Sequence, residues 1–319
     1  MNLFSKIVIA SFAIIAFSCN NENDTTASTK ATSTAAITTA TPKKFLFDAT
    51  KAETAGNADW VIDADAVPQR FPTPAQSNVT ATTTESFWRG ALSSWGIALA
   101  KLGHTVETLP SGTAITYGGT GAQDLKNYDV FVVDEPNIRF STAEKTAILN
   151  FVKNGGGLFM ISDHTVSDRN NDGWDSPAIW NDLMSSNSVQ TNPFGITITL
   201  NNISETTSNR LSATTNPILN GSQGTVTQLK YSNGATMSIN TSANATAQGL
   251  IWRGSSSQGT SNIMCASATF GTGRVVAIGD SSPADDGTGA SGDTLYPGWT
   301  ELASHARLHM NASLWLAKL

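Results

Sequence analysis

A strand–helix–strand unit in the middle of the chain constrains the fold more than any other feature. The apolar run Val130–Val133 predicts a buried strand, and a capping box formed by Ser141 and Glu144 predicts the start of a helix shortly after it. The glycines Gly155–Gly157 end that helix and lead into a second apolar strand, Leu158–Ser162. Two strands joined by one helix through short links form a right-handed parallel crossover. The sequence therefore predicts an α/β domain with a doubly wound sheet.

Other segments enlarge this unit. We expect strands at Phe45–Phe47, His104–Leu109 and Arg274–Ile278, and helices at Glu85–Leu102 and Thr300–Leu316. From about residue 194 to 270 the pattern changes to short strands separated by Ser, Asn and Gly turns. These strands are expected at Ile196–Leu200, Thr225–Leu229, Gly249–Trp252 and Ile263–Phe270. The predicted fold class is α/β, with a doubly wound, mostly parallel flavodoxin-like sheet and a β-rich segment that is either an insertion or an antiparallel extension.

The first 42 residues predict export and a tether. Residues 1–18 carry a short apolar run that indicates a signal peptide, because a spanning helix needs about 20 apolar residues. Cys19 stands where a lipoprotein signal places its acylated first residue, and residues 20–24 resemble the acidic tag of Bacteroidetes-type lipoproteins on the outer face of the outer membrane. The alternative is plain secretion with Cys19 left over. Residues 19–42, rich in Thr, Ala and Ser, look like a tether to a folded domain at 43–319.

The composition limits which classes of partner and which covalent links are expected. The formal net charge is −6, and a protein that binds phosphates needs a clustered basic face, so a nucleic-acid partner is not expected. Contact with the membrane is expected through the lipid anchor only. Beyond Cys19 the chain contains one more cysteine, Cys265, which leaves no internal disulfide to form.

Acidic side chains follow four of the predicted strands. They are Asp48, Asp134–Glu135, Asp163–His164 and Asp280. If these strands are neighbours in one parallel sheet, their carboxyl ends meet at one edge, where ligands bind in open α/β sheets. Carboxylates brought together raise one another's pKa or hold a cation. The alternative is that Asp simply ends strands as a turn residue.

Two loops at the same predicted edge are candidates for ligand binding. The loop after the first strand offers Glu53, Asn57 and Trp60, or is a long ordered loop with internal caps. The Gly-rich loop after the last strand offers Asp285 and Asp286, with Asp280 expected to reach the ligand. Trp299 is expected to form an apolar wall beside them. Ser281, in a Gly-Asp-Ser sequence, is a weaker candidate for an esterase nucleophile.

A candidate calcium loop lies between these regions. Oxygen-bearing residues alternate at Asp168, Asn170 and Asp172, a glycine follows at the sixth position, and Asp175 adds a further carboxylate. The twelfth position is Ile179, so the usual bidentate Glu is missing and a looser calcium site is expected instead. The alternative is a surface loop tightened by Asx-turns.

Two histidines lie four residues apart on the last predicted helix. His305 and His309 share a helix face, but no Glu stands between them in the order that zinc proteases use. A solvated helix face is the main alternative to a metal pair. We expect His305 to point to the edge that holds the acidic residues.

The order of strand, helix, three glycines, buried strand and polar residue resembles the class I glutamine-amidotransferase-like superfamily, and is closest to its secreted, trehalose-utilisation-like branches. The resemblance covers about Lys43–Gly173 and Gly273–Leu316. Amidotransferases place a Cys nucleophile at the turn that Asp163–His164 occupies here, and Cys265 lies within a predicted strand, so thiol-dependent glutamine hydrolysis is not expected. Trehalose-utilisation-like relatives have a His after the glycines, which favours a functional His164.

These observations favour a cell-surface, hydrolase-like lipoprotein that acts on a carbohydrate or related polar molecule. His164 would serve as general base or metal ligand, and Asp163 and Asp280 would orient it or hold a cation, with calcium as the candidate cofactor. The competing hypothesis is a non-catalytic module that binds a glycan or calcium, and a third is an assembly partner at the outer membrane.

Overall fold

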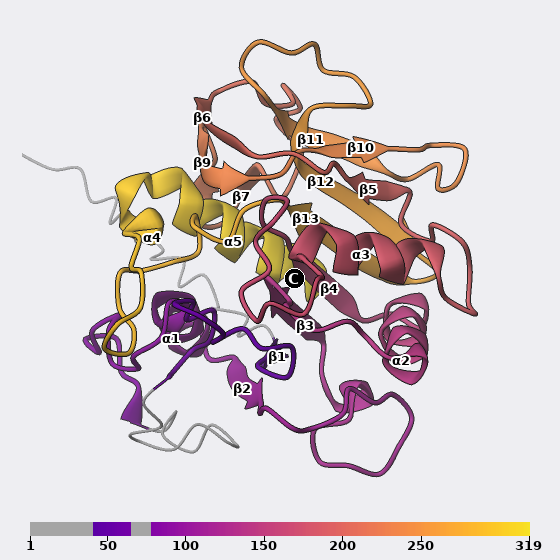
Figure 1. The fold of residues 1–319 in the computed structure, drawn as a ribbon. Coiled ribbons are helices and arrows are strands. Elements are labelled where there is room, and N and C mark those ends of the chain that lie inside the picture. Colours follow the sequence, from indigo (N-terminus) through magenta and orange to yellow (C-terminus); the bar gives the residue numbers. More distant parts are fainter. Residues whose placement is uncertain (1–40, 65–77) are drawn as a thin grey trace, which may run out of the picture. The chain divides into compact units, whose positions relative to one another are not determined.

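A nine-stranded sheet runs through the part of the chain that the computed structural model describes, residues 41–64 and 78–319 (Figure 1). Five of its strands are parallel, in the order β2–β1–β3–β4–β13. They are β1 (Lys44–Asp48), β2 (Thr105–Leu109), β3 (Val130–Asp134), β4 (Gly157–Ile161) and β13 (Gly273–Ile278). The predicted mostly parallel α/β class is confirmed. The predicted signal peptide, Cys19 and the tether up to residue 40 lie outside the described residues.

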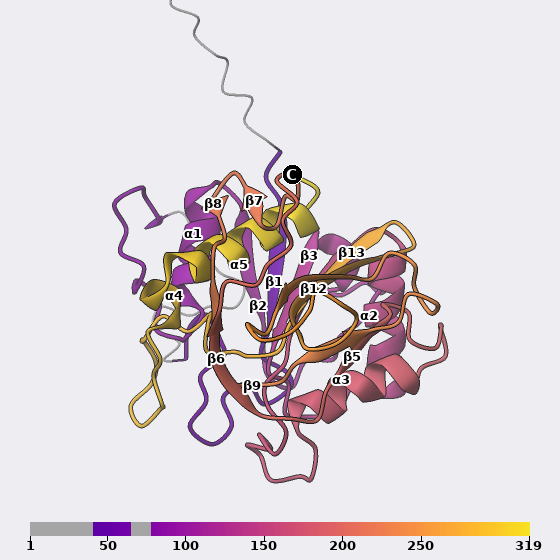
Figure 2. The ribbon, with the colours of Figure 1, turned by 90° about the horizontal axis from the view of Figure 1, so that it is seen from above.

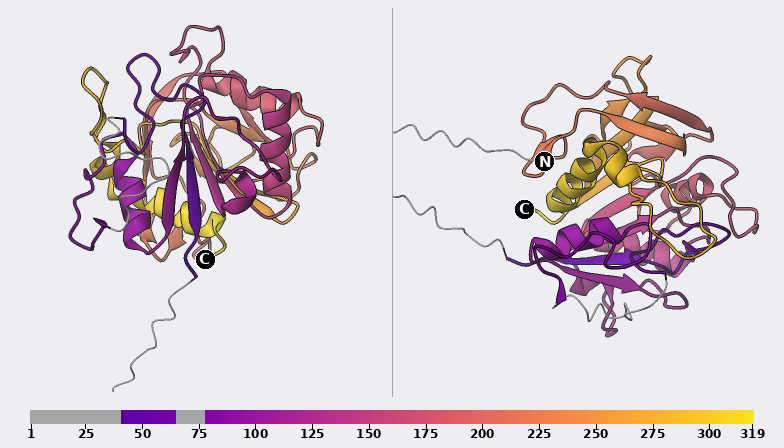
Figure 3. Two further views of the ribbon diagram at one scale, coloured as in Figure 1. Left: turned by 90° about the horizontal axis from the view of Figure 1, so that it is seen from below. Right: turned by 90° about the vertical axis from the view of Figure 1, so that its left-hand side faces the viewer.

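The parallel strands end level with one another. Asp134 at the end of β3 pairs with Ile161 at the end of β4, which in turn pairs with Ile278 at the end of β13. Residues that follow these strands therefore emerge along one edge of the sheet. Figure 3 shows the loops after β1 and β4 at this edge and the C-terminus at the opposite edge.

Both faces of the sheet are buried. In β3, Val130 and Val132 pack on one face, while Phe131 and Val133 pack on the other. Helices α1 and α5 cover the first face and α2 and α3 the second, as Figure 2 shows. Their bounds are α1 (Ser93–Lys101), α2 (Thr142–Lys153), α3 (Ser176–Ser185) and α5 (Ala303–Leu316), with the short α4 (Gly298–Glu301) and η2 (Leu125–Asn127). Burial on both faces explains why these strands are continuous apolar runs.

The β-rich segment is an antiparallel extension of the main sheet. β12 pairs antiparallel with β13, and β10, β5 and β11 continue from it. These strands are β5 (Ile196–Ile198), β10 (Met237–Ile239), β11 (Gln248–Trp252) and β12 (Ile263–Phe270). Two small ribbons lie apart: β6 (Ile203–Thr207) with β9 (Leu229–Gly234), and β7 (Asn220–Gly221) with β8 (Gly224–Thr225). The single strand predicted at Thr225–Leu229 is wrong, because β8 ends where it was to begin.

Helix α2 begins as the sequence predicts. Ser141 Oγ accepts the backbone N–H of Glu144, and the Glu144 carboxylate accepts the backbone N–H of Ser141 in return. This reciprocal pair satisfies two donors at the helix start that would otherwise lack partners. The predicted capping box is confirmed.

Helix α1 is shorter than predicted. It starts at Ser93, and residues 85–92 form turns that pack along the loop after β1. A Cβ at Gly90 would lie 2.3 Å from the Val61 carbonyl oxygen, and the Leu92 N–H donates to that same oxygen at 3.0 Å. This tertiary contact holds the segment in turns despite its helical apolar spacing.

Candidate functional site

The strand order brings together the predicted acidic residues at the ends of β3, β4 and β13. Burial raises the pKa of Asp134 well above its usual value, and the charges of Glu135, Asp163, Asp280 and Asp285 raise it further, in that order. Those four carboxylates come from β3, from the loop after β4 and from the loop after β13. We call Asp134, Glu135, Asp163 and Asp280 the acidic cluster.

The loop after β4 supplies a histidine and the nearest cation. His164 Nδ1 lies 3.1 Å from Asp163 Oδ1, and Arg169 Nη2 lies 3.3 Å from Asp163 Oδ2. Asp163 therefore stands between an imidazole and a guanidinium. The Asp163 carboxylate raises the pKa of His164, against the lowering effect of burial. Burial also raises the pKa of Asp163, which His164 and Arg169 oppose.

Glu135 is the second partner of Arg169. The guanidinium bonds both of its carboxylate oxygens, through Nε to Oε1 and through Nη2 to Oε2, the latter at 3.2 Å. Ser281 Oγ donates to Glu135 Oε2 at 2.9 Å. Burial and the nearby Asp163 charge raise the pKa of Glu135 to about 8, although Arg169 opposes the shift. Glu135 has a left-handed φ of +43°, a strained conformation that is over-represented at functional sites.

Asp134 is buried without partners. It is 1% exposed, and neither carboxylate oxygen has a hydrogen-bond partner among the described residues. An ionised carboxylate in such a place is strongly disfavoured, which agrees with its raised pKa. Burial without partners therefore favours the neutral, protonated form of Asp134.

The loop after β1 places Asp48 and Glu53 together. Asp48 Oδ1 accepts the Thr50 N–H at 3.1 Å, and Glu53 Oε2 accepts the Lys51 N–H at 2.7 Å. Burial raises the pKa of Asp48 to about 6, and burial and the Asp48 charge raise the pKa of Glu53 well above normal. Their other oxygens, Asp48 Oδ2 and Glu53 Oε1, are buried without partners in the described part of the chain.

Asn57 and Trp60 lie beside Arg169. Asn57 Oδ1 accepts from Arg169 Nη1 at 3.2 Å, and the Arg169 guanidinium stands 5.7 Å from the centre of the Trp60 ring. Trp60 is only 2% exposed and packs against Ala58 and Ala91. Trp60 is a buried neighbour of Arg169, so the expectation that it contacts a ligand directly is wrong for this conformation.

The acidic residues of the loop after β13 accept backbone N–H groups and so fix the conformation of that loop. Asp280 Oδ1 accepts the Ser282 N–H at 2.8 Å and Oδ2 accepts the Ser232 N–H. Asp285 accepts the N–H groups of Gly287 and Tyr296, both at 2.8 Å. Asp286 likewise accepts from Ser94 and Thr288 backbone N–H groups, at 2.7 and 2.9 Å. Asp280 is fully buried, so the expectation that it reaches a ligand is wrong. Burial raises the pKa of Asp280 and of Asp285 to about 7.

Trp299 and the two helix histidines are interior residues. Trp299 is 7% exposed and belongs to the core on the α1–α5 face, not to the edge that holds the acidic cluster. His309 is fully buried among Trp95, Phe159 and Trp299, and burial lowers its pKa to about 3. His305 is 1% exposed, with both ring nitrogens bonded to backbone. Neither the solvated helix face nor a His305 aimed at the acidic cluster is present, because α5 packs both rings inward.

Two other candidates are excluded by their contacts. Ser281 is buried and its Oγ donates to the Glu135 carboxylate, not to a histidine, so the described residues do not arrange it as an esterase nucleophile. Cys265 lies in β12, fully buried, and burial raises the pKa of its thiol. Its placement within a strand is confirmed.

The predicted calcium loop is held by its own backbone. Asp168 accepts the N–H groups of Asp172 and Gly173, at 3.0 and 2.7 Å, and Asp172 accepts that of Trp174 at 3.0 Å. Asn170 Oδ1 also accepts from Asp172 at 3.3 Å, and Asp175 caps α3 by accepting the Ala178 N–H at 2.9 Å. Among the described residues, no group of three or more His, Cys, Asp or Glu side chains is arranged to hold a metal ion. The carboxylates here do not fit a calcium ion as placed, and calcium binding stays a prediction of the sequence.

Three residues near the site carried no prediction. Arg169 is the cation that balances the charges of Asp163 and Glu135. Asn137 Oδ1 accepts the backbone N–H of Arg169 at 3.1 Å. Tyr296 is the third, and the charges of Arg169 and Asp163 affect the pKa of its phenol. The sequence did contain a signal that could have identified Arg169. It is the one basic residue in an otherwise acidic and Asn-rich stretch that follows a buried strand.

No protein-family model matches the chain, and no curated protein matches it. Solved structures do. The N-terminal domain of mmIFT52 is 14% identical with a TM-score of 0.48, over 86% of this chain and 97% of that one. A Bacteroides uniformis protein described as thua-like is 12% identical with a TM-score of 0.42, over 86% and 91%. A cytoplasmic protein from Salmonella typhimurium is 13% identical with a TM-score of 0.44, over 68% and 82%.

None of these matches decides a family for this chain, and the predicted superfamily stays a prediction. All three TM-scores lie below 0.5 and all three identities below 25%. No activity is carried over from these proteins, and function has to be argued from the site itself.

Proposed function

We propose that this protein is a cell-surface hydrolase for a carbohydrate or a related polar molecule, with His164 as the residue that transfers protons. The observation that supports this is the Asp163–His164 pair at the carboxyl end of β4. A carboxylate that holds one imidazole nitrogen leaves the other free to exchange a proton. The His164 side chain is 19% exposed, and its Nδ1, 3.1 Å from Asp163 Oδ1, is buried without a hydrogen bond of standard geometry in the described part of the chain.

His164 acts as a general base in this proposal. Its Nε2 takes a proton from a water molecule as that water attacks the substrate, while Asp163 holds Nδ1 and balances the imidazolium charge that forms. The proton then passes from Nε2 to the leaving group. Because Asp163 raises the pKa of His164, the neutral base is populated at higher pH than it is in an ordinary histidine.

Arg169 is a positioning residue. It bonds the Asp163 oxygen that His164 does not approach, and its other bonds to Glu135 and Asn57 fix the guanidinium between two loops. The Asp163 carboxylate is thereby held toward His164. Since the Arg169 charge is already shared by two carboxylates, it offers little to an anionic substrate.

The charge of the site favours an uncharged substrate. Arg169, the cation beside His164, is already paired with Asp163 and Glu135, so an anionic substrate would find no unpaired positive charge there. Neutral sugars carry hydroxyl groups, and carboxyl and amide side chains can hydrogen-bond these hydroxyls without needing a charge of opposite sign on the ligand. The acidic cluster therefore supports a carbohydrate better than a phosphate or carboxylate ester.

Hydrolysis of a panel of neutral glycosides and sugar esters, measured by release of a chromogenic leaving group, tests the proposal. His164→Gln should lower kcat at least 100-fold on any substrate found, because proton transfer is lost. His104→Gln is the matched control, since His104 lies at the opposite edge of the sheet, before β2. Equal turnover by wild type and His164→Gln contradicts the proposal. Sugar binding without turnover by wild type would leave the non-catalytic binding module.

We also propose that the chain is anchored to the outer membrane by a lipid on Cys19. The apolar run before Cys19 and the tether after it support this location. No helix in the described part of the chain is long and apolar enough to cross a membrane. Cys19→Ala should move the protein from the membrane fraction to the soluble fraction. Retention of the variant in the membrane contradicts a lipid anchor at this residue.

A further inference from the structure

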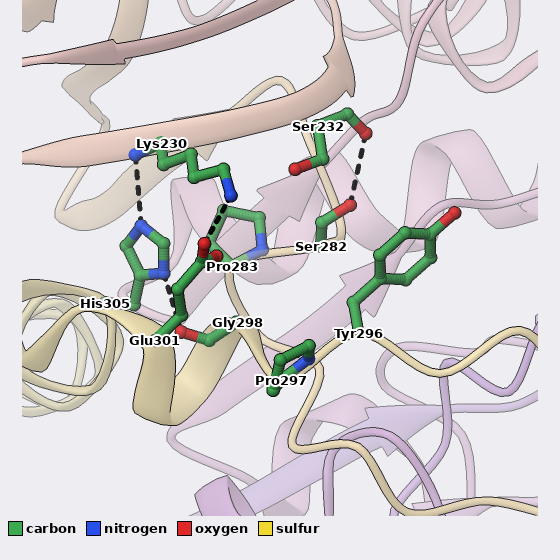
Figure 4. Close-up of a pocket in the computed structure, with 9 residues that line it drawn as sticks. All are labelled: Lys230, Ser232, Ser282, Pro283, Tyr296, Pro297, Gly298, Glu301 and His305. Carbon is green, nitrogen blue, oxygen red and sulfur yellow. Dashed lines mark hydrogen bonds and ion pairs between the residues drawn. The ribbon is translucent and has the colours of Figure 1, made fainter.

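A small cavity is lined by two serines that Asp280 bonds. It has a volume of about 100 Å³ and lies between β9, the loop after β13 and the segment that leads into α5 (Figure 4). A space of this size holds about three water molecules, or part of a sugar ring. No residue that lines it, apart from His305, was singled out as a ligand contact in the sequence.

Asp280 lies behind the cavity and holds two of the residues that line it. Its buried carboxylate accepts the N–H groups of Ser232 in β9 and of Ser282 after β13. Ser282 Oγ also donates to the Ser232 carbonyl oxygen at 3.3 Å. Two segments 50 residues apart in sequence thus present their serine side chains next to each other (Figure 4).

The cavity carries no free charge. Lys230 Nζ is paired with the Glu301 carboxylate. His305 Nε2 accepts the Lys230 backbone N–H at 3.0 Å, so this nitrogen carries no proton. The ring proton is on Nδ1, which donates to the Gly298 carbonyl oxygen at 2.7 Å. His305 is therefore neutral. A phosphate or carboxylate would find no unpaired cation here, and a basic ligand no unpaired carboxylate.

The remaining lining combines hydroxyl groups with apolar rings. Ser232 and Ser282 supply hydroxyls on one side, and the Tyr296 and Pro297 rings stand on the other (Figure 4). An uncharged sugar matches this pairing, because its ring has hydroxyl edges and apolar C–H faces. A purely apolar ligand would leave the serine hydroxyls without partners.

We propose that this cavity is the subsite that holds a neutral sugar unit of the substrate, a proposal that rests on the function proposed above. Its connection to His164 runs through two residues. Ser281 donates to Glu135 at 2.9 Å, directly before Ser282 in the chain. Tyr296 lines the cavity, and the charges of Arg169 and Asp163 act on its phenol. A sugar in the cavity would extend past Tyr296 toward the Asp163–His164 pair.

Calorimetric titration with the methyl glycosides of glucose, mannose and galactose tests this subsite. At least one should bind, and glucuronate and glucosamine should each bind more weakly than the matching neutral sugar. Ser232→Ala and Ser282→Ala should weaken that binding about fivefold or more, because each removes one hydroxyl partner. Ser222→Ala, at an exposed position outside the cavity, is the matched control and should leave binding unchanged. Thermal unfolding of every variant checks that the fold is kept.

The subsite and the hydrolase proposal fail separately. His164→Gln should abolish turnover and keep sugar affinity within about twofold. If no glycoside is hydrolysed but the serine variants still weaken sugar binding, the subsite stands and catalysis fails. If glycosides are hydrolysed with a KM that neither serine variant changes, the subsite is overturned. Tighter binding of glucuronate than of glucose, or no binding of any neutral sugar, also overturns it.

Discussion

Arg169 Nη2 contacts two acidic residues at once, Asp163 Oδ2 at 3.3 Å and Glu135 Oε2 at 3.2 Å. The two carboxylates follow neighbouring strands, β4 and β3, and their side chains are 4% and 0% exposed. One partly exposed guanidinium therefore neutralises charge from two buried acids. The position of Asp163, and with it that of His164, depends on this shared contact.

Removal of the Arg169 charge should destabilise the fold in a pH-dependent way. Arg169→Met leaves Glu135 and Asp163 buried without a counter-charge, so we expect a loss of about 2–4 kcal/mol in the free energy of unfolding at pH 8. At pH 5 the loss should be smaller, because the carboxyl groups take up protons instead. Urea unfolding at both pH values measures the effect.

Lys101→Met is the matched control for this prediction. It breaks the Lys101–Glu85 ion pair, in which the Glu85 side chain is 45% exposed. Exposed pairs contribute at most about 1 kcal/mol, and the loss should not change between pH 5 and pH 8. Equal losses for the two variants would show that Arg169 makes an ordinary surface contact.

His164 should titrate differently from the other three histidines. Asp163 raises the pKa of His164 above 6.5, whereas burial lowers the pKa values of His104, His305 and His309 below it. Titration of the imidazole resonances by NMR should therefore show one histidine above 6.5 and three below. Two or more histidines above 6.5 would contradict this assignment.

Asp163→Asn tests the cause of that shift. Loss of the carboxylate should lower the pKa of His164, and the acidic limb of any pH–rate profile should move to lower pH with it. The maximum rate should fall as well, because the imidazolium loses its counter-charge. If the His164 titration is unchanged in Asp163→Asn, the pair does not interact.

The sequence predicts the position of the site because that position depends on local patterns. Glycines after a capped helix, followed by an apolar strand, determine where β4 ends, and parallel neighbours must then end at the same edge. The places of Asp48, Asp134, Glu135 and Asp163 follow from this rule alone. Nothing in that rule states which of these side chains faces solvent.

Contacts between distant segments determine the rest. The Asp280 carboxylate accepts the backbone N–H of Ser232 in β9, 48 residues earlier in the chain. His305 Nε2 accepts the backbone N–H of Lys230, 75 residues earlier. The turns before α1 are held by the Val61 carbonyl oxygen, in the loop after β1. A local pattern of Asp, His or apolar residues cannot encode such partners. In the sequence, an Asp after a strand that bonds only to backbone groups therefore cannot be told from one that binds a ligand.

The pairing of Asp59 with Asp293 should make stability depend on pH. The Ala290 N–H donates to Asp59 Oδ2 at 3.1 Å and to Asp293 Oδ2 at 2.9 Å, which brings the two carboxyl groups together. Burial first, and then the Asp293 charge, raise the pKa of Asp59 to about 8. A carboxyl whose folded pKa is raised contributes stability that is complete below its unfolded pKa and is lost as pH rises through the folded pKa.

Asp59→Asn should therefore gain stability relative to wild type as pH rises from about 4 to 8, by about 2 kcal/mol or more, at about 1.4 kcal/mol per pKa unit. Denaturant unfolding at several pH values gives this difference. Asp172→Asn, at an exposed position, should follow wild type across the range. A difference between Asp59→Asn and wild type that stays constant with pH would mean that Asp59 is ionised throughout.

Asp175 should stabilise the loop after β4 without calcium. Its Oδ1 caps α3 through the Ala178 N–H at 2.9 Å, and its Oδ2 accepts the Val166 N–H at 2.7 Å. Asp175→Ala should cost about 1–2 kcal/mol in the free energy of unfolding, the usual loss for an N-cap, in chelator and in millimolar calcium alike. A rise in Tm with calcium that Asp172→Ala removes would show instead that the loop oxygens leave their backbone donors for a metal ion, since the same lone pairs cannot serve both.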